Sequence, residues 1–529
     1  MLRSRSVVAF LLGGVLLTAA QSAESPYAYQ DGLPRSTPEA EGVPSKTIAR
    51  FFEQVEEKGY DVHGLMILRH GKVIAEHWWA PYAPEYQHAM YSATKTFTGM
   101  AVGFAVQEKL LSPDDKVISF FPDLLPETIS PELEKLTVRH LLTMSVCHAS
   151  TRYAGSGKSQ IRSFLAAPFV QEPGTSFAYN ITASHTLSHI IARVTGVSIH
   201  EYLKPRLLDP LGIGDVVWEM DNDGINMGNG GSHMKTADLA KLGLFLQNRG
   251  AWNGEQLLNP EWITDATRPH IFQHPDWTPE QIAAAKDDGA QGYGYQIWMG
   301  RHGSYRAIGG QNQLAMVIPE YDLVVACHSS IGDEAGFNSL IYDMLPSMRS
   351  EALEPDPSFD LNAAIAGYEI KRPFGASTVS KVTMETRRYE MAENDLGVES
   401  VLFRFDGAGD CTLTLVCKGA VHNIPFGLDH WKIGMTDRTL LFARSAYPNP
   451  MDVTPVRTAG ICTWTADDKL SAYFLSMFNP GSSETFEFSF EGDELKMEIV
   501  PPTGTRFGPP GMAAAKTEPI ILNGTKIKD

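Results

Sequence analysis

Cysteine is scarce in this sequence, and its distribution argues against a protein held together by disulfides. Five cysteines occur among 529 residues, namely Cys147, Cys327, Cys411, Cys417 and Cys462. An odd number spread this thinly excludes a disulfide framework, although a single bridge among the three C-terminal cysteines remains open. Cys411 and Cys417 do not form that bridge within one continuous strand, because the strand between them extends over ~20 Å.

Basic residues are also in short supply. Lysine and arginine together number 44 against 62 aspartates and glutamates, which gives a formal net charge of −18. Nucleic acid is therefore excluded as a partner, since phosphate backbones are bound by clustered lysine and arginine. Residues 157–159 (Gly-Lys-Ser) are similar to the end of a phosphate-binding loop, but Arg152 stands where that motif requires its first glycine.

Recognisable metal-ligand motifs are missing as well. His185 and His189 have the spacing of a metal-binding pair on a helix, yet Thr186 follows the first histidine where a zinc protease carries glutamate. We therefore interpret the two histidines as ordinary residues on one helix face. The sequence predicts neither a metal site nor an organic cofactor.

Long apolar runs are absent except at the N-terminus. Arg3 and Arg5 precede an apolar run at residues 7–20, and small residues at positions 20, 22 and 23 offer a cleavage site. This pattern predicts a secretory signal over residues 1–23 and a secreted or periplasmic protein with no membrane span after signal cleavage. The alternative is an uncleaved membrane anchor.

Strand-like patterns at both ends of the first 350 residues enclose a helical middle. Helices are predicted over residues 47–57 and 335–345, and helical patterns dominate residues 90–250. Strands are predicted over residues 63–68, 73–79, 292–299, 304–308, 314–318 and 322–326. This order predicts an α/β (α+β) fold, in which one antiparallel sheet is flanked by helices and carries an inserted helical lobe. The first and last helices are expected to cover the outer face of the sheet.

Residues 351–378 are loop-like and contain Pro355, Pro357 and Pro373, so we predict a linker there. It separates a domain at residues 24–350 from a C-terminal domain at residues 379–529. In the second domain, turns separate strands predicted over residues 401–405, 411–416, 439–444, 462–465, 470–478 and 485–490. That spacing predicts a small all-β domain, either a barrel or a sandwich.

The most informative motif is Ser92-Ala93-Thr94-Lys95. Serine and lysine three apart on the first turn of a helix point the same way, which places an amine within reach of a hydroxyl. That pair is the minimum apparatus of a self-activated serine nucleophile. Apolar residues at positions 97, 101, 104 and 105 follow at helical spacing, so Ser92 begins a buried helix that holds its hydroxyl in place.

A second Ser-x-x-Lys at Ser232 and Lys235 serves as an internal control, because the tetrapeptide also arises by chance. Thr236 is the expected N-cap of a helix over residues 237–247. Ser232 and Lys235 then lie on the incoming loop without helical registration, so we do not expect them to form a nucleophile.

Tyr179 is the next candidate along the chain. It follows a Pro-Gly turn at residues 173–174 and precedes a helix that we expect Thr182 to cap and Gly196 to end. This places Tyr179 on a tight loop, where binding groups are often displayed.

Gly309 and Gly310 follow a strand-like segment further on. Glycines at such a position let a substrate approach the backbone closely. The backbone amides of Ser92 and Gly310 are therefore candidates for an oxyanion hole in acyl transfer.

Taken in this order, Ser92-x-x-Lys95, Tyr179 and a glycine-rich strand resemble the serine β-lactamase-related superfamily, which includes class C β-lactamases, DD-peptidases, related esterases and aminohexanoate-dimer hydrolases. The similarity covers roughly residues 45–345 and includes the segments 141–144, 173–175, 231–250, 252–254 and 292–295. It implies a β-lactamase/transpeptidase-like fold, with the active site between the sheet and the helical lobe.

The resemblance also implies a role for each matched residue. Ser92 would be the nucleophile, Lys95 its general base or proton relay, and Tyr179 the group that carries a proton to the leaving group. The residues of the oxyanion hole and substrate-binding edge would be Gly310, Gly309 and Asn180.

Two departures from the superfamily pattern bear on specificity. The Tyr-x-Asn pattern reads Tyr179-Asn180-Ile181, so the usual amide ligand is either displaced or absent. The Lys- or His-led triplet reads Ala-Ile-Gly at residues 307–309, which removes the usual cation near a substrate carboxylate. Both departures favour an esterase or amidase that acts on a small-molecule or peptide-like substrate. The alternatives are a β-lactamase or DD-carboxypeptidase proper, and a non-catalytic descendant that binds a peptide or glycan. The sequence does not fix the oligomeric state.

Overall fold

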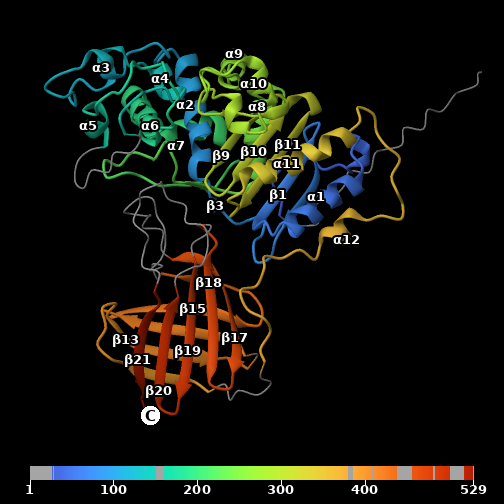
Figure 1. Cartoon of the computed structure of the whole chain (residues 1–529), viewed down its shortest axis with the longest axis vertical. Coiled ribbons are helices and arrows are strands. Elements are labelled where there is room, and N and C mark those ends of the chain that lie inside the picture. Colours follow the sequence, from blue (N-terminus) through green and yellow to red (C-terminus); the bar gives the residue numbers. More distant parts are fainter. Residues whose placement is uncertain are drawn as a thin grey trace, which may run out of the picture.

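The computed structural model describes residues 27, 29–150, 160–378, 385–407, 409–437, 455–479, 483–500 and 518–527. The signal predicted at residues 1–23, the Gly-Lys-Ser segment at 157–159 and the strand predicted at 439–444 lie outside these residues. Figure 1 shows two bodies. We call the mixed part, residues 29–370, the α/β body, and the all-strand part below it, residues 387–526, the barrel.

A six-stranded antiparallel sheet forms the centre of the α/β body, with its strands in the order β2-β1-β11-β10-β9-β8. The strands are β1 (Val62–Arg69), β2 (Lys72–Trp78), β8 (Trp298–Met299), β9 (Tyr305–Gly309), β10 (Gln313–Ile318) and β11 (Leu323–Ser329). The chain leaves the sheet after β2 and returns about 220 residues later at β8. The long segment between them forms the helical lobe, as the sequence predicts.

Helices cover both faces of this sheet. The central strands are therefore buried on both sides. On the outer face, α1 (Ser45–Glu57), α11 (Glu334–Met344) and α12 (Leu361–Ile365) share one hydrophobic cluster. On the inner face lie α2 (Thr94–Gln107) and α8 (Thr236–Gln247). The first and last predicted helices therefore cover the outer face, as expected. Helix α12 falls within the stretch predicted as a linker.

Shorter elements complete the α/β body. The remaining helices are α3 (Pro131–Lys135), α4 (Val138–Leu142), α5 (Gln160–Leu165), α6 (Ile181–Thr195), α7 (Ile199–Leu203), α9 (Pro260–Ala266) and α10 (Pro279–Ala284). The small sheets are β3-β5-β4 (His88–Ala89, Ser232–Met234, Val217–Trp218) and β6-β7 (Ala251–Trp252, Glu255–Gln256). No described helix is both long and apolar enough to cross a membrane.

The strand predicted over residues 292–299 is wrong for most of its length. Only Trp298 and Met299 are extended, in β8. Gly292 and Gln296 adopt φ angles of 104° and 60°, and such left-handed residues interrupt an extended chain. The apolar residues between them are buried nevertheless, so their alternation belongs to a loop packed into the core.

The C-terminal body is a closed barrel, which decides between the two predicted architectures. Its strands run in the order β15-β14-β13-β12-β21-β20-β19-β18-β17, and a parallel pairing of β15 with β17 joins the ends. Strand β16 pairs with β17 beside this closure and ends the strand order. The strands are β12 (Arg387–Met391), β13 (Val398–Phe405), β14 (Cys411–Cys417), β15 (Ala420–Leu428), β16 (Lys432–Thr436), β17 (Val456–Ala466), β18 (Lys469–Ser476), β19 (Ser483–Glu491), β20 (Glu494–Val500) and β21 (Ile520–Lys526).

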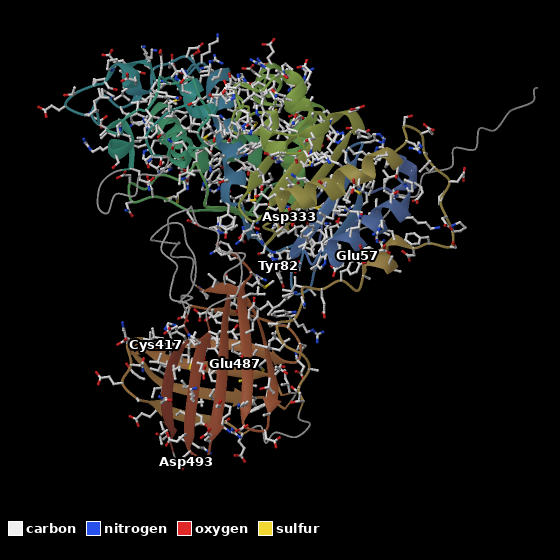
Figure 2. All side chains as sticks on the ribbon, viewed as in Figure 1. Glu57, Tyr82, Asp333, Cys417, Glu487 and Asp493 are labelled. Atoms are coloured by element: carbon white, nitrogen blue, oxygen red, sulfur yellow. The ribbon has the colours of Figure 1, made fainter. Side chains whose placement is uncertain are left out.

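Five strands predicted for the C-terminal domain fall on β13, β14, β17, β18 and β19, while the other described strands of the barrel escaped prediction. Cys411 and Cys417 occupy the two ends of the continuous strand β14, as the sequence argument requires. The five cysteines all lie within the described residues and form no disulfide. In Figure 2, Tyr82 marks the side of the α/β body that faces the barrel, and Glu487 marks the barrel itself.

Candidate active site

Ser92 sits on a tight turn between strand β3 and helix α2. The turn is a 3-10 segment, Tyr91–Ala93, and Ala93 N donates a hydrogen bond to Met90 O. Tyr91 has a φ of 44°, a left-handed conformation that is uncommon for a bulky residue and costs of the order of 1 kcal/mol or more. The surrounding packing holds this conformation, so the position of Ser92 is set by tertiary contacts.

Lys95 supplies the amine that the sequence predicts beside this serine. Its Nζ donates to Ser92 Oγ at 2.8 Å and to the backbone oxygen of Asn229 at 2.6 Å. The side chain is only 1% exposed, so bulk water does not compete for these contacts. A hydroxyl held against an amine in this way is the arrangement of a lysine-activated nucleophile.

The second Ser-x-x-Lys forms no such pair. Ser232 lies in strand β5, and Lys235 is the N-cap of α8, with its Nζ over the ring of Tyr29 at 5.2 Å. Helix α8 therefore begins at Thr236, and the expectation that this threonine is the cap is wrong by one residue. Asp238 accepts the Lys235 N–H and so fixes the helix start there.

Ser232 nevertheless supports the Ser92 turn, a role that the sequence did not predict. Its Oγ lies 2.7 Å from Thr94 Oγ1, and its backbone oxygen accepts a hydrogen bond from Met90 N at 2.9 Å. Strand β5 is thus bonded to the residues on both sides of Ser92. No local pattern signals this role, because the partners are about 140 residues apart.

Tyr179 lies beside the amine, as the superfamily pattern implies. Lys95 Nζ is 5.0 Å from the centre of the tyrosine ring. The ring also stacks on Trp298 at 5.7 Å and meets the edge of Tyr293 at 6.5 Å. Trp298 therefore forms part of an aromatic wall next to the amine.

Asn180 has a structural role that the sequence assigned to Thr182. Its Oδ1 accepts a hydrogen bond from Ala183 N at 3.0 Å, which makes Asn180 the N-cap of α6. The residue is 1% exposed. Its carbonyl oxygen is thus already used to cap the helix, and the structure gives no support to Asn180 as a substrate ligand. Gly196 ends this helix in a left-handed conformation, as predicted.

Gly309 and Gly310 bring the end of β9 against the Ser92 turn. A Cβ on Gly309 would lie 2.1 Å from Met90 O and 3.0 Å from Ala93 N, so only glycine permits this approach. From the sequence we expected the glycines to let a substrate approach the backbone closely. In the structure, the missing side chain of Gly309 instead lets the Ser92 turn approach β9. Gly310 O accepts from Gln313 Nε2 at 3.0 Å, which fixes the peptide that follows.

A buried cluster of side chains holds the loop that contains Asn229, the residue whose backbone oxygen contacts Lys95. His185 Nε2 and His189 Nε2 lie 2.8 and 2.9 Å from one oxygen of Asp221. Burial alone would raise the pKa of Asp221, but the hydrogen bonds from both histidines outweigh it and keep that pKa well below its usual range. The two histidines therefore do more than the ordinary helix-face residues that the sequence suggested.

The same three side chains are close enough together to surround a metal ion. Gly228 N, however, donates to His185 Nδ1 at 3.3 Å, which leaves the ring proton on Nε2, the atom that faces Asp221. A metal ion requires a free lone pair on that nitrogen. The cluster is thus best described as a set of hydrogen bonds that hold the loop at residues 221–229 against α6.

Two titratable groups lie near the nucleophile on the side of the barrel. Burial raises the pKa of Glu219 to about 7 and lowers the pKa of His233 to about 4, although a hydrogen bond that the His233 ring donates to Asn479 Oδ1 opposes the second shift. The glutamate Oε1 and the histidine Nε2 are 4.0 Å apart. At the triplet 307–309, Ala307 is buried and uncharged, so the first position of the triplet supplies no cation.

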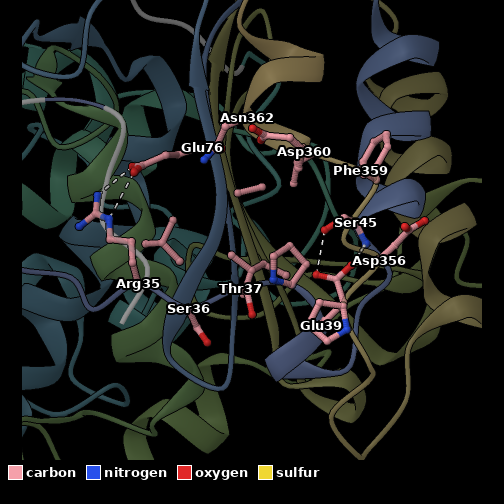
Figure 3. Close-up of a pocket in the computed structure, with 16 residues that line it drawn as sticks. Arg35, Ser36, Thr37, Glu39, Ser45, Glu76, Asp356, Phe359, Asp360 and Asn362 are labelled. Atoms are coloured by element: carbon pink, nitrogen blue, oxygen red, sulfur yellow. Dashed lines mark hydrogen bonds and ion pairs between the residues drawn. The ribbon is translucent and has the colours of Figure 1, made fainter. Parts of the chain in front are cut away.

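A cavity of about 290 Å³ opens elsewhere on the α/β body, beside β2 (Figure 3). Its polar side chains are paired with one another. Arg35 Nη2 contacts Glu76 Oε2 at 2.8 Å, and Ser45 Oγ donates to Glu39 Oε2 at 2.9 Å. Three strands separate β2 from β9 in the sheet, and the described residues that line this cavity include no lysine beside a serine. The Ser92 turn, and not this cavity, is the candidate active site.

The chain is similar to known proteins over most of the α/β body. A family model described as Beta-lactamase matches residues 48–340. The 6-aminohexanoate-dimer hydrolase of Paenarthrobacter ureafaciens is 24% identical over 341 residues, which cover 61% of this chain and 84% of that protein.

Solved structures with a similar fold include a family VIII carboxylesterase, with a TM-score of 0.46 and 15% identity over 59% of this chain and 99% of the other. Another is the octameric penicillin-binding protein homologue of Pyrococcus abyssi, with a TM-score of 0.44 and 20% identity over 85% of this chain and 97% of the other.

Proposed function

Because the chain belongs to the Beta-lactamase family of hydrolases, we propose that it cleaves an ester or amide bond through a covalent acyl-enzyme on Ser92. The observation that carries this proposal is the 2.8 Å hydrogen bond between Lys95 Nζ and Ser92 Oγ. The relationship to a 6-aminohexanoate-dimer hydrolase supports the same reaction class.

The reaction requires Lys95 as a neutral amine, whose lone pair accepts the proton of Ser92 while the serine oxygen attacks the substrate carbonyl. The backbone N–H groups of Ser92 and Gly310 would stabilise the oxyanion, which fits the fixed approach of β9 to the turn. Tyr179, beside the amine, would pass a proton to the leaving group. Water then attacks the acyl-enzyme, and the same groups return the proton to Ser92.

The substrate of this proposal is a small-molecule or peptide-like ester or amide that needs no carboxylate partner at the triplet 307–309. The aromatic wall of Tyr179, Tyr293 and Trp298 favours an apolar or planar group beside the reacting bond. No cofactor or metal takes part in the proposed chemistry. We also propose that residues 1–23 direct export, so that the enzyme acts in the periplasm or outside the cell.

The test is intact-mass spectrometry after treatment with a fluorophosphonate, next to turnover of p-nitrophenyl esters and nitrocefin. We expect one adduct on Ser92, ester turnover, and loss of both in Ser92→Ala. Ser198→Ala is the matched control, because this serine only caps helix α7. Nitrocefin turnover would point to a β-lactamase. Folded protein that forms no adduct and turns over no ester would refute the proposal and favour the non-catalytic binding function.

A further inference from the structure

The barrel contacts the strand that leads into the Ser92 turn. Ala89 N, in β3, donates a hydrogen bond to the backbone oxygen of Phe478 at 2.9 Å. Phe478 follows strand β18 of the barrel, and Ala89 lies three residues before the nucleophile. In Figure 1, β3 accordingly lies at the side of the α/β body that faces the barrel.

A second contact reaches strand β5. The ring of Phe478 stacks on the ring of His233, with centres 3.7 Å apart and planes 5° apart. Asn479 Oδ1 lies 3.3 Å from His233 Nε2. The neighbouring Ser232 is the residue whose oxygen atoms hold Met90 and Thr94. The barrel therefore contacts both strands that fix the turn.

The contact between the two bodies extends beyond Phe478 and Asn479. Ala459, Leu475 and Met477 of the barrel belong to the same hydrophobic cluster as the outer helices of the α/β body. Arg457 of the barrel also lies over the ring of Tyr86 at 4.1 Å. A hydrophobic core that continues from one body into the other fixes their relative position.

The strands of the small sheet need such support. Strand β3 has two residues, β4 two and β5 three, and a sheet this short has little stability of its own. The Ala89 N–H is buried at the junction, and without Phe478 O it would lose its hydrogen-bond acceptor. The strained φ of Tyr91 two residues later also has to be held by its surroundings.

We propose that the barrel is a positioning element of the active site, in which Phe478 and Asn479 hold β3 and β5 and thereby set the geometry of Ser92. Neither residue touches the reacting atoms. The inference rests on the proposed serine chemistry. It gives the C-terminal domain a role in catalysis.

The experiment compares Phe478→Ala with Phe490→Ala in the full-length protein. Phe478 and Phe490 are both buried, at 8% and 7% exposure, but Phe490 belongs to the hydrophobic cluster made up of barrel residues, where it contacts Phe403 and Trp464. The control variant therefore weakens the barrel without touching β3 or β5. All rates are measured at a temperature at which circular dichroism shows each variant folded.

We expect Phe478→Ala to slow fluorophosphonate labelling of Ser92 by about tenfold or more relative to Phe490→Ala, because small displacements of a nucleophile have large kinetic effects. Ester kcat should fall while KM changes little. Deuterium exchange should rise in the peptide that contains residues 88–93 in Phe478→Ala but not in Phe490→Ala.

Variants of the facing histidine provide a second route if Phe478→Ala does not fold. His233→Ala should lower the labelling rate, and His233→Phe, which keeps the stacked ring, should restore most of it. Equal labelling and exchange in folded Phe478→Ala and Phe490→Ala would overturn the inference, as would a His233→Ala variant with wild-type labelling. Absence of labelling in the wild type would instead refute the proposed function, and deuterium exchange would still test the positioning role.

Discussion

A methyl group on Gly309 is the smallest change that should disable the site without altering a chemical group. In Gly309→Ala the new Cβ would lie 2.1 Å from Met90 O and 3.0 Å from Ala93 N, the two residues that flank the Ser92 turn. The glycine does not adopt a left-handed φ, so alanine adds crowding and no backbone strain.

The size of the effect follows from the distance. Relieving the contact with Met90 O requires a relative displacement of about 1 Å between β9 and the turn, and a misplacement of that size can cost about a hundredfold in rate. We therefore expect kcat/KM for an ester to fall about a hundredfold, equivalent to about 2.7 kcal/mol. Overpacking should also lower the free energy of unfolding by about 1–3 kcal/mol.

The assay pairs ester kinetics with thermal unfolding, and Gly214→Ala is the control because a Cβ there meets no atom within 4 Å. The control should retain both activity and melting temperature. A folded Gly309→Ala protein with near wild-type kcat/KM would refute the reasoning. It would mean that β9 and the turn can separate without consequence for the nucleophile.

Three further predictions concern the groups around the turn. Lys95→Met should keep the fold, as judged by circular dichroism, and lower kcat/KM by about 10²–10⁴-fold, the usual contribution of a positioned base; unchanged ester kinetics would contradict the assignment. Asp221→Asn should lower the free energy of unfolding by about 1–3 kcal/mol at pH 7, because it weakens a buried hydrogen-bond cluster. Since the folded pKa of Asp221 lies below its ordinary value, this difference should be full above about pH 4 and shrink below it. The folded pKa of Glu219 is instead raised from 4.5 to about 7, so the folded protein binds the proton more tightly and wild-type stability should fall as pH rises from about 4.5 to 7. Glu219→Gln lacks this slope, and differential scanning fluorimetry should show it gaining on the wild type between pH 5 and pH 8, by at most about 3 kcal/mol.

The sequence was sufficient to find the parts of the site that depend on local geometry. Ser92 lies in the 3-10 turn that leads directly into α2, and Lys95 lies in the first turn of that helix, so the three-residue spacing already indicates their contact. The helices and strands at residues 47–79 and 304–345 have clear periodicity and appear where the patterns place them. The nine-stranded closure of the barrel depends on which strands pair, and periodicity does not specify pairing.

The residues that sequence reasoning missed are those brought together from distant parts of the chain. Asn229 contributes a backbone oxygen, which any residue could supply, and Ser232 acts mainly through tertiary neighbours. The strand predicted at 292–299 failed because apolar alternation does not reveal the left-handed φ of Gln296. Similarly, the cap of helix α6 was assigned to Thr182 although Asn180 is an equally good capping residue.

The strand order of the central sheet has a consequence for how the chain folds as it is made. Strand β1 is apolar and buried on both faces, and its second neighbour, β11, follows about 250 residues later. During synthesis, one apolar edge of the β1–β2 hairpin therefore stays exposed until β11 has been made. An exposed edge of this kind can pair with other chains and lead to aggregation. The large sequence separation also predicts slow sheet formation. A chaperone that binds extended apolar segments would thus act chiefly on residues 62–78 until the segment at 323–329 has emerged.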